Sequence, residues 1–115
     1  MTTIEPGMTK AWHYHKNQTD RMLLLRGTVR FGCVRELEST EQKVLLDLVV
    51  RDIDPKLIVI PPKIYHGFMN MGNEEAYILN IPTKAYDRNS PDETRASYNI
   101  FSETCFRWGG LEYHG

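Results

Sequence analysis

The chain has few of the features that mark membrane, secreted or nucleic-acid-binding proteins. Its longest apolar stretches are only a few residues, which excludes a membrane-spanning helix. No basic run stands out and the net charge is −1 with neutral histidines, so nothing favours nucleic-acid binding. The first residues are polar and include Pro6, without the apolar stretch of a signal peptide. We therefore expect a cytoplasmic protein that binds neither membranes nor nucleic acids.

Cysteine is also scarce. Cys33 lies within a strand pattern and Cys105 in the polar C-terminal part, an arrangement typical of reduced intracellular thiols rather than of a disulfide framework. The 115 residues are 41% hydrophobic and 25% charged, a globular composition. Because no repeat or linker divides the chain, we expect a single domain with its own core.

Short apolar segments separated by turn signals make up most of the chain. Within Thr28–Arg35 the pattern has a period of two, as in a half-buried strand. Glu36–Lys43 fits a loop or a short helical turn, and another helical turn is expected near Pro91–Arg95. Many short strands predict an all-β fold, an antiparallel sandwich or barrel of the jelly-roll kind. The predicted strands are Lys10–His15, Arg21–Arg26, Thr28–Arg35, Val44–Val50, Leu57–Ile60, Ile64–Asn70 and Ala76–Ile81.

Three histidines and a carboxylate fall in these strand regions. His13 and His15 are two residues apart, so their side chains point to the same face of a strand. Asp20 follows five positions after His15, and His66 comes much later. Such a set predicts either a metal site or a small-molecule acid/base site inside a β-barrel.

The spacing of the first cluster resembles the first motif of the cupin superfamily. Gly7 lies six residues before His13, Asp20 lies five after His15, and Gly27 lies seven after Asp20. Aspartate stands at position 20 where glutamate is usual in that motif. The resemblance implies a cupin jelly-roll fold with the histidines facing the inside of the barrel.

A later segment resembles the second cupin motif. Pro61, His66 and Asn70 match its spacing, with Lys63 where a glycine is usual. Two motifs in the right order strengthen the fold prediction.

A narrower resemblance is to the dTDP-4-dehydrorhamnose 3,5-epimerase family of sugar-nucleotide cupins, and it covers roughly Ile4 to Arg95. It implies a nucleotide-sugar substrate, and on family resemblance alone a role in cell-surface polysaccharide or glycosylated-metabolite synthesis. The segments that carry it are Trp12-His13-Tyr14, Leu25–Val29, Ile60–Phe68, Tyr86 and Pro91-Asp92-Glu93.

Members of that family usually carry several tens of residues before the segment that opens here. In such cupins that part often supplies a strand that crosses to a dimer partner. The chain is therefore expected to be one cupin domain over residues 1–115 that lacks an N-terminal strand segment. Three explanations stay open: the chain is a fragment, its annotated start is too late, or it is a compact relative. A homodimer is expected, since pairing covers the edges of a jelly roll.

The epimerase resemblance assigns roles in proton transfer. A 4-keto sugar has acidic C–H bonds beside its carbonyl, and a histidine is suited to remove one of these protons near neutral pH. By resemblance His13 is this base and Tyr86 the acid that returns the proton. The lysine that the family places near the active site falls at Asp20 here. Lys63, Arg21 or His15 must then stabilise the enolate oxyanion, and the sequence does not choose among them.

The remaining candidates concern substrate binding. His66 is expected to hold the phosphate or sugar hydroxyls, and Lys63 is a further binding candidate. Arg26 and Arg30 are expected to pair with the diphosphate, because guanidinium groups suit that geometry. No metal is required in this interpretation.

Two alternatives stay open. His13, His15, Asp20 and His66 form the ligand set of metal cupins, suited to a divalent ion such as Fe(II), Mn(II) or Zn(II) and to oxygenase or isomerase chemistry. A non-catalytic cupin that only binds sugars is the other alternative, since aspartate replaces the family lysine.

Overall fold

The computed structural model describes residues 1–36, 42–83, 92–96, 106–109 and 111–113. Over these residues the regular structure consists of β-strands alone, and no helix among them is long and apolar enough to span a membrane. Each strand predicted between residues 10 and 81 is present, with ends that differ by at most two residues from the prediction. The strands are β1 (Thr2–Ile4), β2 (Met8–His15), β3 (Asp20–Arg26), β4 (Thr28–Glu36), β5 (Gln42–Arg51), β6 (Leu57–Ile60), β7 (Tyr65–Asn70), β8 (Ala76–Asn80), β9 (Glu93–Arg95) and β10 (Leu111–Tyr113).

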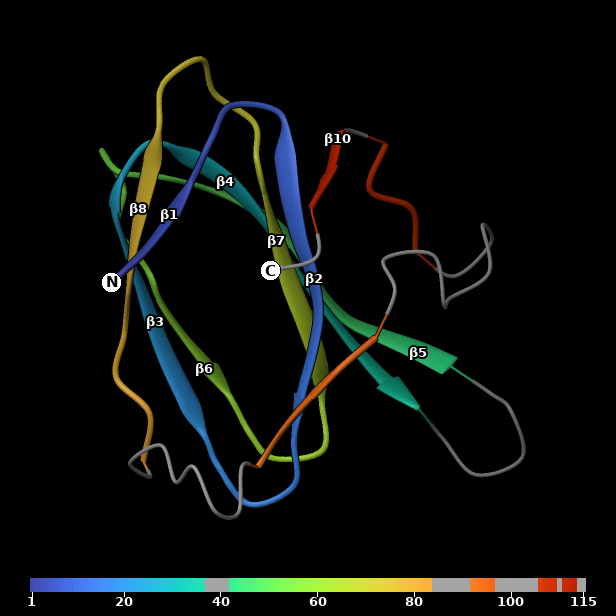
Figure 1. Cartoon of the computed structure of the whole chain (residues 1–115). Helices are drawn as coiled ribbons and strands as arrows, with labels where there is room; N and C mark the ends of the chain where they lie inside the picture. Colours follow the sequence, from blue (N-terminus) through green and yellow to red (C-terminus); the bar gives the residue numbers. More distant parts are fainter. Residues whose placement is uncertain (37–41, 84–91, 97–105, 110, 114–115) are drawn as a thin grey trace.

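These strands form two sheets that face each other (Figure 1). The first contains four strands in the order β1-β8-β3-β6, and the second runs β10-β2-β7-β4-β5 with β9 also paired to β2. Neighbouring strands are antiparallel except β10, which lies parallel to β2. The predicted all-β jelly roll is therefore confirmed, and the two sheets enclose the space into which the candidate histidines point.

The main core fills the space between the sheets and follows the alternation read from the sequence. On β4, Val29, Phe31 and Cys33 face this core and are buried. Phe31 meets Phe68 of β7 edge to face, with ring centroids 6.0 Å apart. Cys33 is a free thiol, and burial raises its pKa to about 12. Cys105, the other cysteine, lies outside the described residues.

A second apolar cluster covers the outer face of the six-stranded sheet. Trp12 of β2 packs against Phe106 and Trp108, with ring centroids 5.0 Å away in both cases. Gly32 and Gly67 lie in the sheet directly beneath these rings, so no side chain fills the space at those two positions. A Cβ at Gly32 would come within 2.5 Å of the Phe106 ring, and one at Gly67 within 3.0 Å of the Trp108 ring. Residues 106–109 thus pack on the sheet at the two glycines.

Three short segments differ from the sequence-based expectation. The helical turn predicted near Pro91–Arg95 is wrong, because Glu93–Arg95 forms β9 and pairs with β2. Similarly, Gln42 and Lys43 belong to β5 instead of a loop or helical turn. Strand β1 was not predicted either. These segments are too short to show a period, and pairing with a neighbouring edge decides their structure.

Gly32→Ala should destabilise the fold, because the added methyl group collides with the Phe106 ring. We expect a loss of about 1–3 kcal/mol in the free energy of unfolding, measured by urea denaturation. Gly72→Ala is the matched control, since a Cβ there meets nothing closer than 3.4 Å and should change stability by less than about 0.5 kcal/mol. Equal losses in the two variants would contradict this account of the outer cluster.

Candidate functional site

The candidate histidines and Asp20 come together on the inner side of the two sheets. His13 and His15 lie on β2, Asp20 opens β3, and His66 lies on β7. His13 is in register with His66 across the β2–β7 pair, and their rings are stacked with centroids 6.0 Å apart. The ring of His15 is also stacked on that of His66, at 5.5 Å. The prediction that His13 and His15 share a face with His66 is confirmed in this geometry.

An irregularity in β2 brings a further residue onto the same side. The register of β2 with β7 shifts between Lys10 and His13. In a regular strand residues three apart face opposite ways, and a bulge of this kind reverses that relation. As a result Lys10 and His13 line one cavity, while Ala11 and Trp12 pack into the outer cluster.

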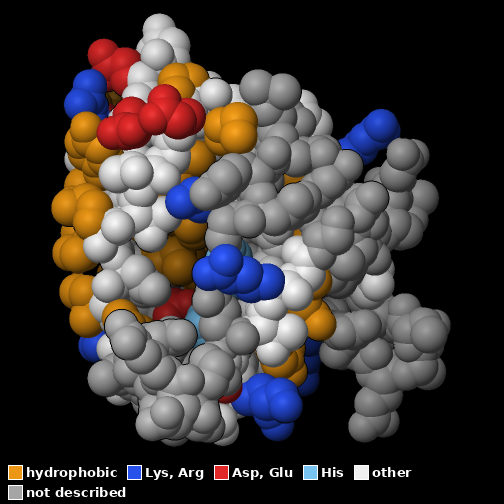
Figure 2. Space-filling model, viewed as in Figure 1, with side chains coloured by type: hydrophobic (Ala, Val, Ile, Leu, Met, Phe, Trp, Pro, Cys, Tyr) orange, Lys and Arg blue, Asp and Glu red, His pale blue; other side chains and the backbone are white. Residues whose placement is uncertain are grey.

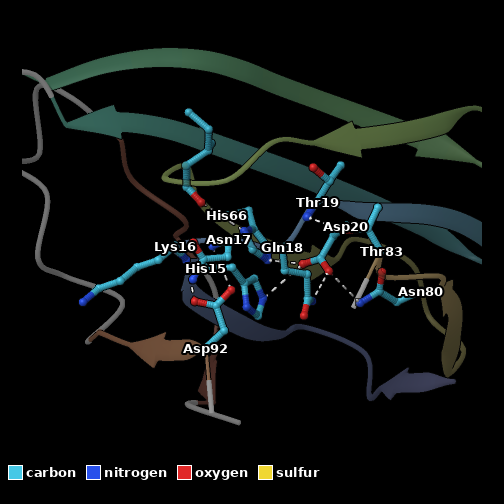
Figure 3. Close-up of polar contacts among 11 residues, drawn as sticks. His15, Lys16, Asn17, Gln18, Thr19, Asp20, His66, Asn80, Thr83 and Asp92 are labelled. Carbon is cyan, nitrogen blue, oxygen red and sulfur yellow. Dashed lines mark hydrogen bonds and ion pairs between the residues drawn. The ribbon is translucent and has the colours of Figure 1, made fainter. Parts of the chain in front are cut away.

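Asp20 is the centre of a hydrogen-bonded network at the bottom of the site (Figure 3). One of its oxygens, Oδ2, lies 3.2 Å from Nε2 of His15 and 3.2 Å from Nε2 of His66. The other, Oδ1, accepts hydrogen bonds from the amides of Gln18 at 2.6 Å and Asn80 at 3.3 Å. The Asp20 side chain is only 1% exposed, so these four neighbours take the place of water.

The pKa of Asp20 reflects two opposed effects. Burial alone raises it, because a charged carboxylate is unfavourable away from water. Hydrogen bonds from His15, His66 and Gln18 lower it by more, so the pKa lies far below the ordinary range. Asp20 is therefore an ionised acceptor that orients imidazoles, and it is not suited to act as a general base near neutral pH.

The backbone fixes the orientation of His66. Its Nδ1 lies 3.2 Å from the carbonyl oxygen of Ile64, so an Nδ1–H can donate there. In that neutral tautomer Nε2, which faces Asp20, carries a lone pair and can bind a cation, whereas donation to Asp20 requires a proton on Nε2. The His66 ring is thus held between the Ile64 carbonyl, which contacts Nδ1, and Asp20, which contacts Nε2.

The loop between His15 and Asp20 is held by residues distant in sequence. Asp92 accepts hydrogen bonds from the backbone N–H groups of Lys16 and Asn17, both at 2.9 Å, and the bond from Asn17 is the first cause that lowers the Asp92 pKa. Thr83 accepts a hydrogen bond from the Thr19 amide at 3.0 Å. The chain after β8 therefore closes around the loop that carries His15 and Asp20.

The site opens into a cavity of about 230 Å³ between the sheets. Figure 2 shows a hollow on this face, with acidic and histidine side chains at its bottom and basic side chains at its border. Two cations line it, Lys10 and Arg95, and neither was predicted from the sequence. Arg95 reaches it because β9 pairs with β2 and places Arg95 opposite His13. The lining residues are Thr2, Lys10, His13, His15, Asp20, Met22, His66, Phe68, Asn80 and Arg95.

Two of the predicted diphosphate ligands lie elsewhere. Arg30 is on the outer face of the six-stranded sheet, where it pairs with Asp47 through two hydrogen bonds of 2.8 and 2.9 Å. Its guanidinium also lies over the Phe106 ring, 4.6 Å from the centroid. Arg26 is on the surface and pairs with Glu74 at 3.0 Å. Neither arginine lines the histidine cavity, because strand alternation turns Arg30 outward and Arg26 lies at the far end of β3. Their role as diphosphate ligands stays a prediction.

Lys63 likewise does not line the cavity. It is exposed in the turn before β7, and its backbone has φ of 66°, the left-handed region that favours glycine. Its backbone N–H donates to the carbonyl of His15 at 2.6 Å, which ties this turn to the end of β2. Arg21, another candidate for the oxyanion, is exposed and its Nε donates to the carbonyl of Ile81. The predicted acid Tyr86 lies outside the described residues.

Comparison with known proteins gives the family. Residues 1–94 match the model of the polysaccharide biosynthesis C-terminal domain. The chain belongs to this family. It is 33% identical over 96 residues to the probable low-salt glycan biosynthesis epimerase Agl13 of Haloferax volcanii, covering 82% of this chain and 62% of that protein. It is 30% identical over 105 residues to the spore coat polysaccharide biosynthesis protein SpsL of Bacillus subtilis, covering 90% of this chain and 68% of SpsL.

Solved structures confirm the fold, which this chain shares with two sugar-nucleotide enzymes. A dTDP sugar isomerase from Desulfovibrio desulfuricans G20 superposes with a TM-score of 0.70 at 21% identity, covering 86% of this chain and 63% of that one. The dTDP-4-dehydrorhamnose 3,5-epimerase from Sulfolobus tokodaii gives a TM-score of 0.69 at 20% identity, with 88% and 58% covered. The chain thus spans roughly three fifths to two thirds of the length of these relatives.

The pKa of Asp20 predicts an acid-sensitive fold. Because the ionised form is favoured in the folded protein, its contribution to stability is present above the unfolded-state pKa of about 3.9 and is lost as the pH falls below it. In urea denaturation between about pH 5 and pH 3, below the ordinary range of histidine, the wild type should lose stability more steeply than Asp20→Asn.

Asp54→Asn serves as the control, because the Asp54 carboxylate is 78% exposed. It should follow the acid slope of the wild type. If Asp20→Asn lost stability with falling pH as steeply as the wild type, the Asp20 carboxylate would not be the cause of the acid sensitivity.

Proposed function

We propose that this domain epimerises a nucleotide-linked 4-keto-6-deoxyhexose at C3, C5 or both, without a metal. The observation that carries the proposal is the position of His13. It lines the cavity beside Lys10 and Arg95, yet it is not among the three side chains whose ligating atoms converge, His15, Asp20 and His66. A neutral imidazole in that place is suited to remove a proton from a bound substrate.

The chemistry follows from the groups around His13. Removal of the proton beside the keto group leaves an enolate, and its oxygen needs a cation or a donor nearby. The sequence left Lys63, Arg21 or His15 for this role. Of the described residues that line the cavity, Arg95 lies opposite His13 in the β2–β9 register, so we assign the oxyanion to its guanidinium. His66 and His15, fixed by Asp20, would bind sugar hydroxyls.

Return of the proton on the other face of the ring inverts the centre. The family resemblance assigns this step to Tyr86, and that assignment stays a prediction. The printed names of the relatives, a glycan biosynthesis epimerase and dTDP-sugar epimerases, support the reaction class and a nucleotide-sugar substrate for this chain.

Proton exchange tests the proposal directly. The protein is incubated with dTDP-4-keto-6-deoxyglucose in deuterated water and followed by proton NMR. We expect the C3 or C5 proton signal to disappear with the wild type. With His13→Asn the exchange rate should be at least about a hundredfold lower, because general base catalysis contributes that much or more. Lys56→Met, on an exposed side chain, should leave the rate unchanged.

A folded wild type that exchanges neither proton would overturn the assignment for this substrate. If such a sample were still stabilised by the nucleotide sugar, the result would favour a non-catalytic sugar-binding domain, because a ligand that binds only the folded state raises its stability.

A metal centre is the second candidate, and one observation favours it. The ligating atoms of His15, Asp20 and His66 lie within 4.8 Å of one another, so they can converge on one divalent ion. The hydrogen bond between Nδ1 of His66 and Ile64 leaves Nε2 directed inward, as in metal-binding histidines. His13, the fourth ligand predicted from the sequence, is not in this set. A bound ion would supply Lewis-acid chemistry for an isomerase or oxygenase reaction.

Metal analysis separates the two candidates. If the proposed epimerase is correct, protein dialysed against a chelator and shown by elemental analysis to hold far less than one ion per chain should still exchange the substrate proton. Exchange that disappears with the metal, returns on adding Zn²⁺ or Mn²⁺, and is absent in His15→Ala would instead establish a metal enzyme.

The expected homodimer finds support in the edges of the two sheets. Among the described residues, β5 and β6 carry exposed apolar side chains, including Leu45, Val49, Leu57 and Val59. An apolar groove of about 350 Å³ lies between these two strands. Exposed apolar edges of this kind are covered by pairing in many proteins. The dimer and the cytoplasmic location stay predictions.

A further inference from the structure

Residues 92–96 lie along the end of β2 that carries the histidines. Within β9, Arg95 is in register with His13. Just beyond this strand, Trp12 and Ala96 exchange two backbone hydrogen bonds of 2.9 Å each. A strand as short as β9 has few backbone contacts of its own, so its register on β2 depends on what holds its two ends.

Asp92 holds the end of this segment opposite Ala96 (Figure 3). Its Oδ1 accepts the backbone N–H of Lys16 and its Oδ2 accepts that of Asn17, both at 2.9 Å. Two successive N–H groups directed at one carboxylate form an anion-binding nest, and hydrogen bonds to an ionised acceptor are stronger than those between neutral groups. The bond from Asn17 is also the main cause that keeps the pKa of Asp92 below its ordinary value, so the carboxylate is charged near neutral pH.

The register that Asp92 fixes decides which way Arg95 points. Side chains alternate along a strand, so a shift of one residue between β9 and β2 would turn Arg95 to the outer face. Such a shift moves the segment by about 3.3 Å, and a carboxylate displaced by that much can no longer accept from both Lys16 and Asn17. In the observed register Arg95 lines the histidine cavity opposite His13.

The position of Asp92 outside the cavity limits what it can do. Of the described residues, those that line the cavity include Arg95 and His13 but not Asp92. Asp92 therefore cannot take a proton from a sugar there, and its effect on a reaction has to pass through a residue that it holds. Two routes exist: along its own segment to Arg95, or through the loop, where Gln18 donates to Asp20 at 2.6 Å.

The route through Arg95 depends more on Asp92 than the route through the loop does. Asp20 has three further side-chain contacts that do not involve Asp92. By contrast, β9 pairs with β2 alone among the described strands. Loss of the Asp92 contacts should therefore loosen β9 before it disturbs the network around Asp20.

We infer that Asp92 is a positioning residue that sets the register of β9 on β2 and so holds Arg95 opposite His13. The inference rests on the proposed function, in which Arg95 stabilises the enolate oxyanion. The Asp92 carboxylate thus contributes to the rate of the reaction without touching the substrate.

Amide hydrogen exchange followed by NMR tests the first half of the inference without a substrate. Asp92→Asn keeps the size of the side chain but replaces one acceptor oxygen by an NH2 group, which cannot accept from the backbone. The Ala96 N–H, which donates to the Trp12 carbonyl, should then exchange about tenfold faster or more. Asp52→Asn is the matched control, because Asp52 also accepts a backbone N–H, that of Gly27 at 2.8 Å, but holds no part of β9. It should leave the Ala96 exchange rate within about twofold of the wild type.

Steady-state rates of C3 or C5 proton exchange with dTDP-4-keto-6-deoxyglucose test the second half. Arg95→Met should lower kcat about a hundredfold or more, and Asp92→Asn about tenfold. KM should stay within about threefold in Asp92→Asn, because the weakened contact stabilises the transition state rather than the bound substrate. In an Arg95→Met background Asp92→Asn should change kcat by less than about twofold, since two residues that act through one contact are not additive. Asp52→Asn should leave kcat unchanged.

Unfolding temperatures, measured without substrate, show whether each variant is folded. If Asp92→Asn does not fold, Asp92→Ser takes its place, because one short hydroxyl cannot accept from both N–H groups. Asp92→Glu keeps both acceptor oxygens, so its kcat should lie within about fivefold of the wild type. The inference is overturned if the Ala96 N–H exchanges in folded Asp92→Asn as in the wild type, or if Asp92→Asn lowers kcat equally with and without Arg95.

Failure of the proposed function is a separate outcome. If the folded wild type exchanges neither substrate proton, the reaction and the catalytic half of the inference are overturned together, and the Ala96 measurement still decides whether Asp92 holds β9. If the wild type exchanges a substrate proton and Asp92→Asn does so equally fast, only the inference is overturned.

Discussion

The buried carboxylate of Asp20 is the constraint around which the site is arranged. An ionised carboxylate inside a protein costs several kcal/mol unless hydrogen bonds replace its water. Here His15, His66, Gln18 and Asn80 supply them, and they come from β2, the loop after it, β7 and β8. The same contacts therefore join the two sheets and fix both imidazole rings. Any substitution that leaves Asp20 charged but removes a partner exposes the structure to that cost.

Strand β2, which carries His13 and His15, has neighbouring strands on both of its edges. One side of it pairs with β7, and the other side is covered by β9 near the histidines and by β10 near its beginning. Without these late segments β2 would be an open edge next to the cavity. Their pairing both protects the edge and delivers Arg95 and Asp92, one to the cavity and one to the loop that holds His15 and Asp20. The segment that contains β9 therefore both covers the edge of β2 and completes the site.

The sequence was sufficient for the fold and for the histidines, because both depend on local patterns. Alternation located the strands, and the two-residue spacing of His13 and His15 set their common face. The same alternation turns Arg30 to the outer face, where it pairs with Asp47 instead of lining the cavity. The sequence did not predict Lys10, because in a regular strand a residue three before His13 faces away, and only the shift in register brings it inside. Arg95 depends on a pairing over more than eighty residues that no local pattern contains.

The network also explains why the proton base and the metal alternative involve different histidines. Nε2–H groups of His15 and His66 can donate to Asp20, and a bound cation would take the place of those hydrogens. Both arrangements involve the same three side chains, His15, Asp20 and His66. His13, which also lines the cavity, is not one of these three. In the proposed reaction the charge that stabilises the enolate would come from Arg95 or from a bound ion, and His13 would be the base in both cases.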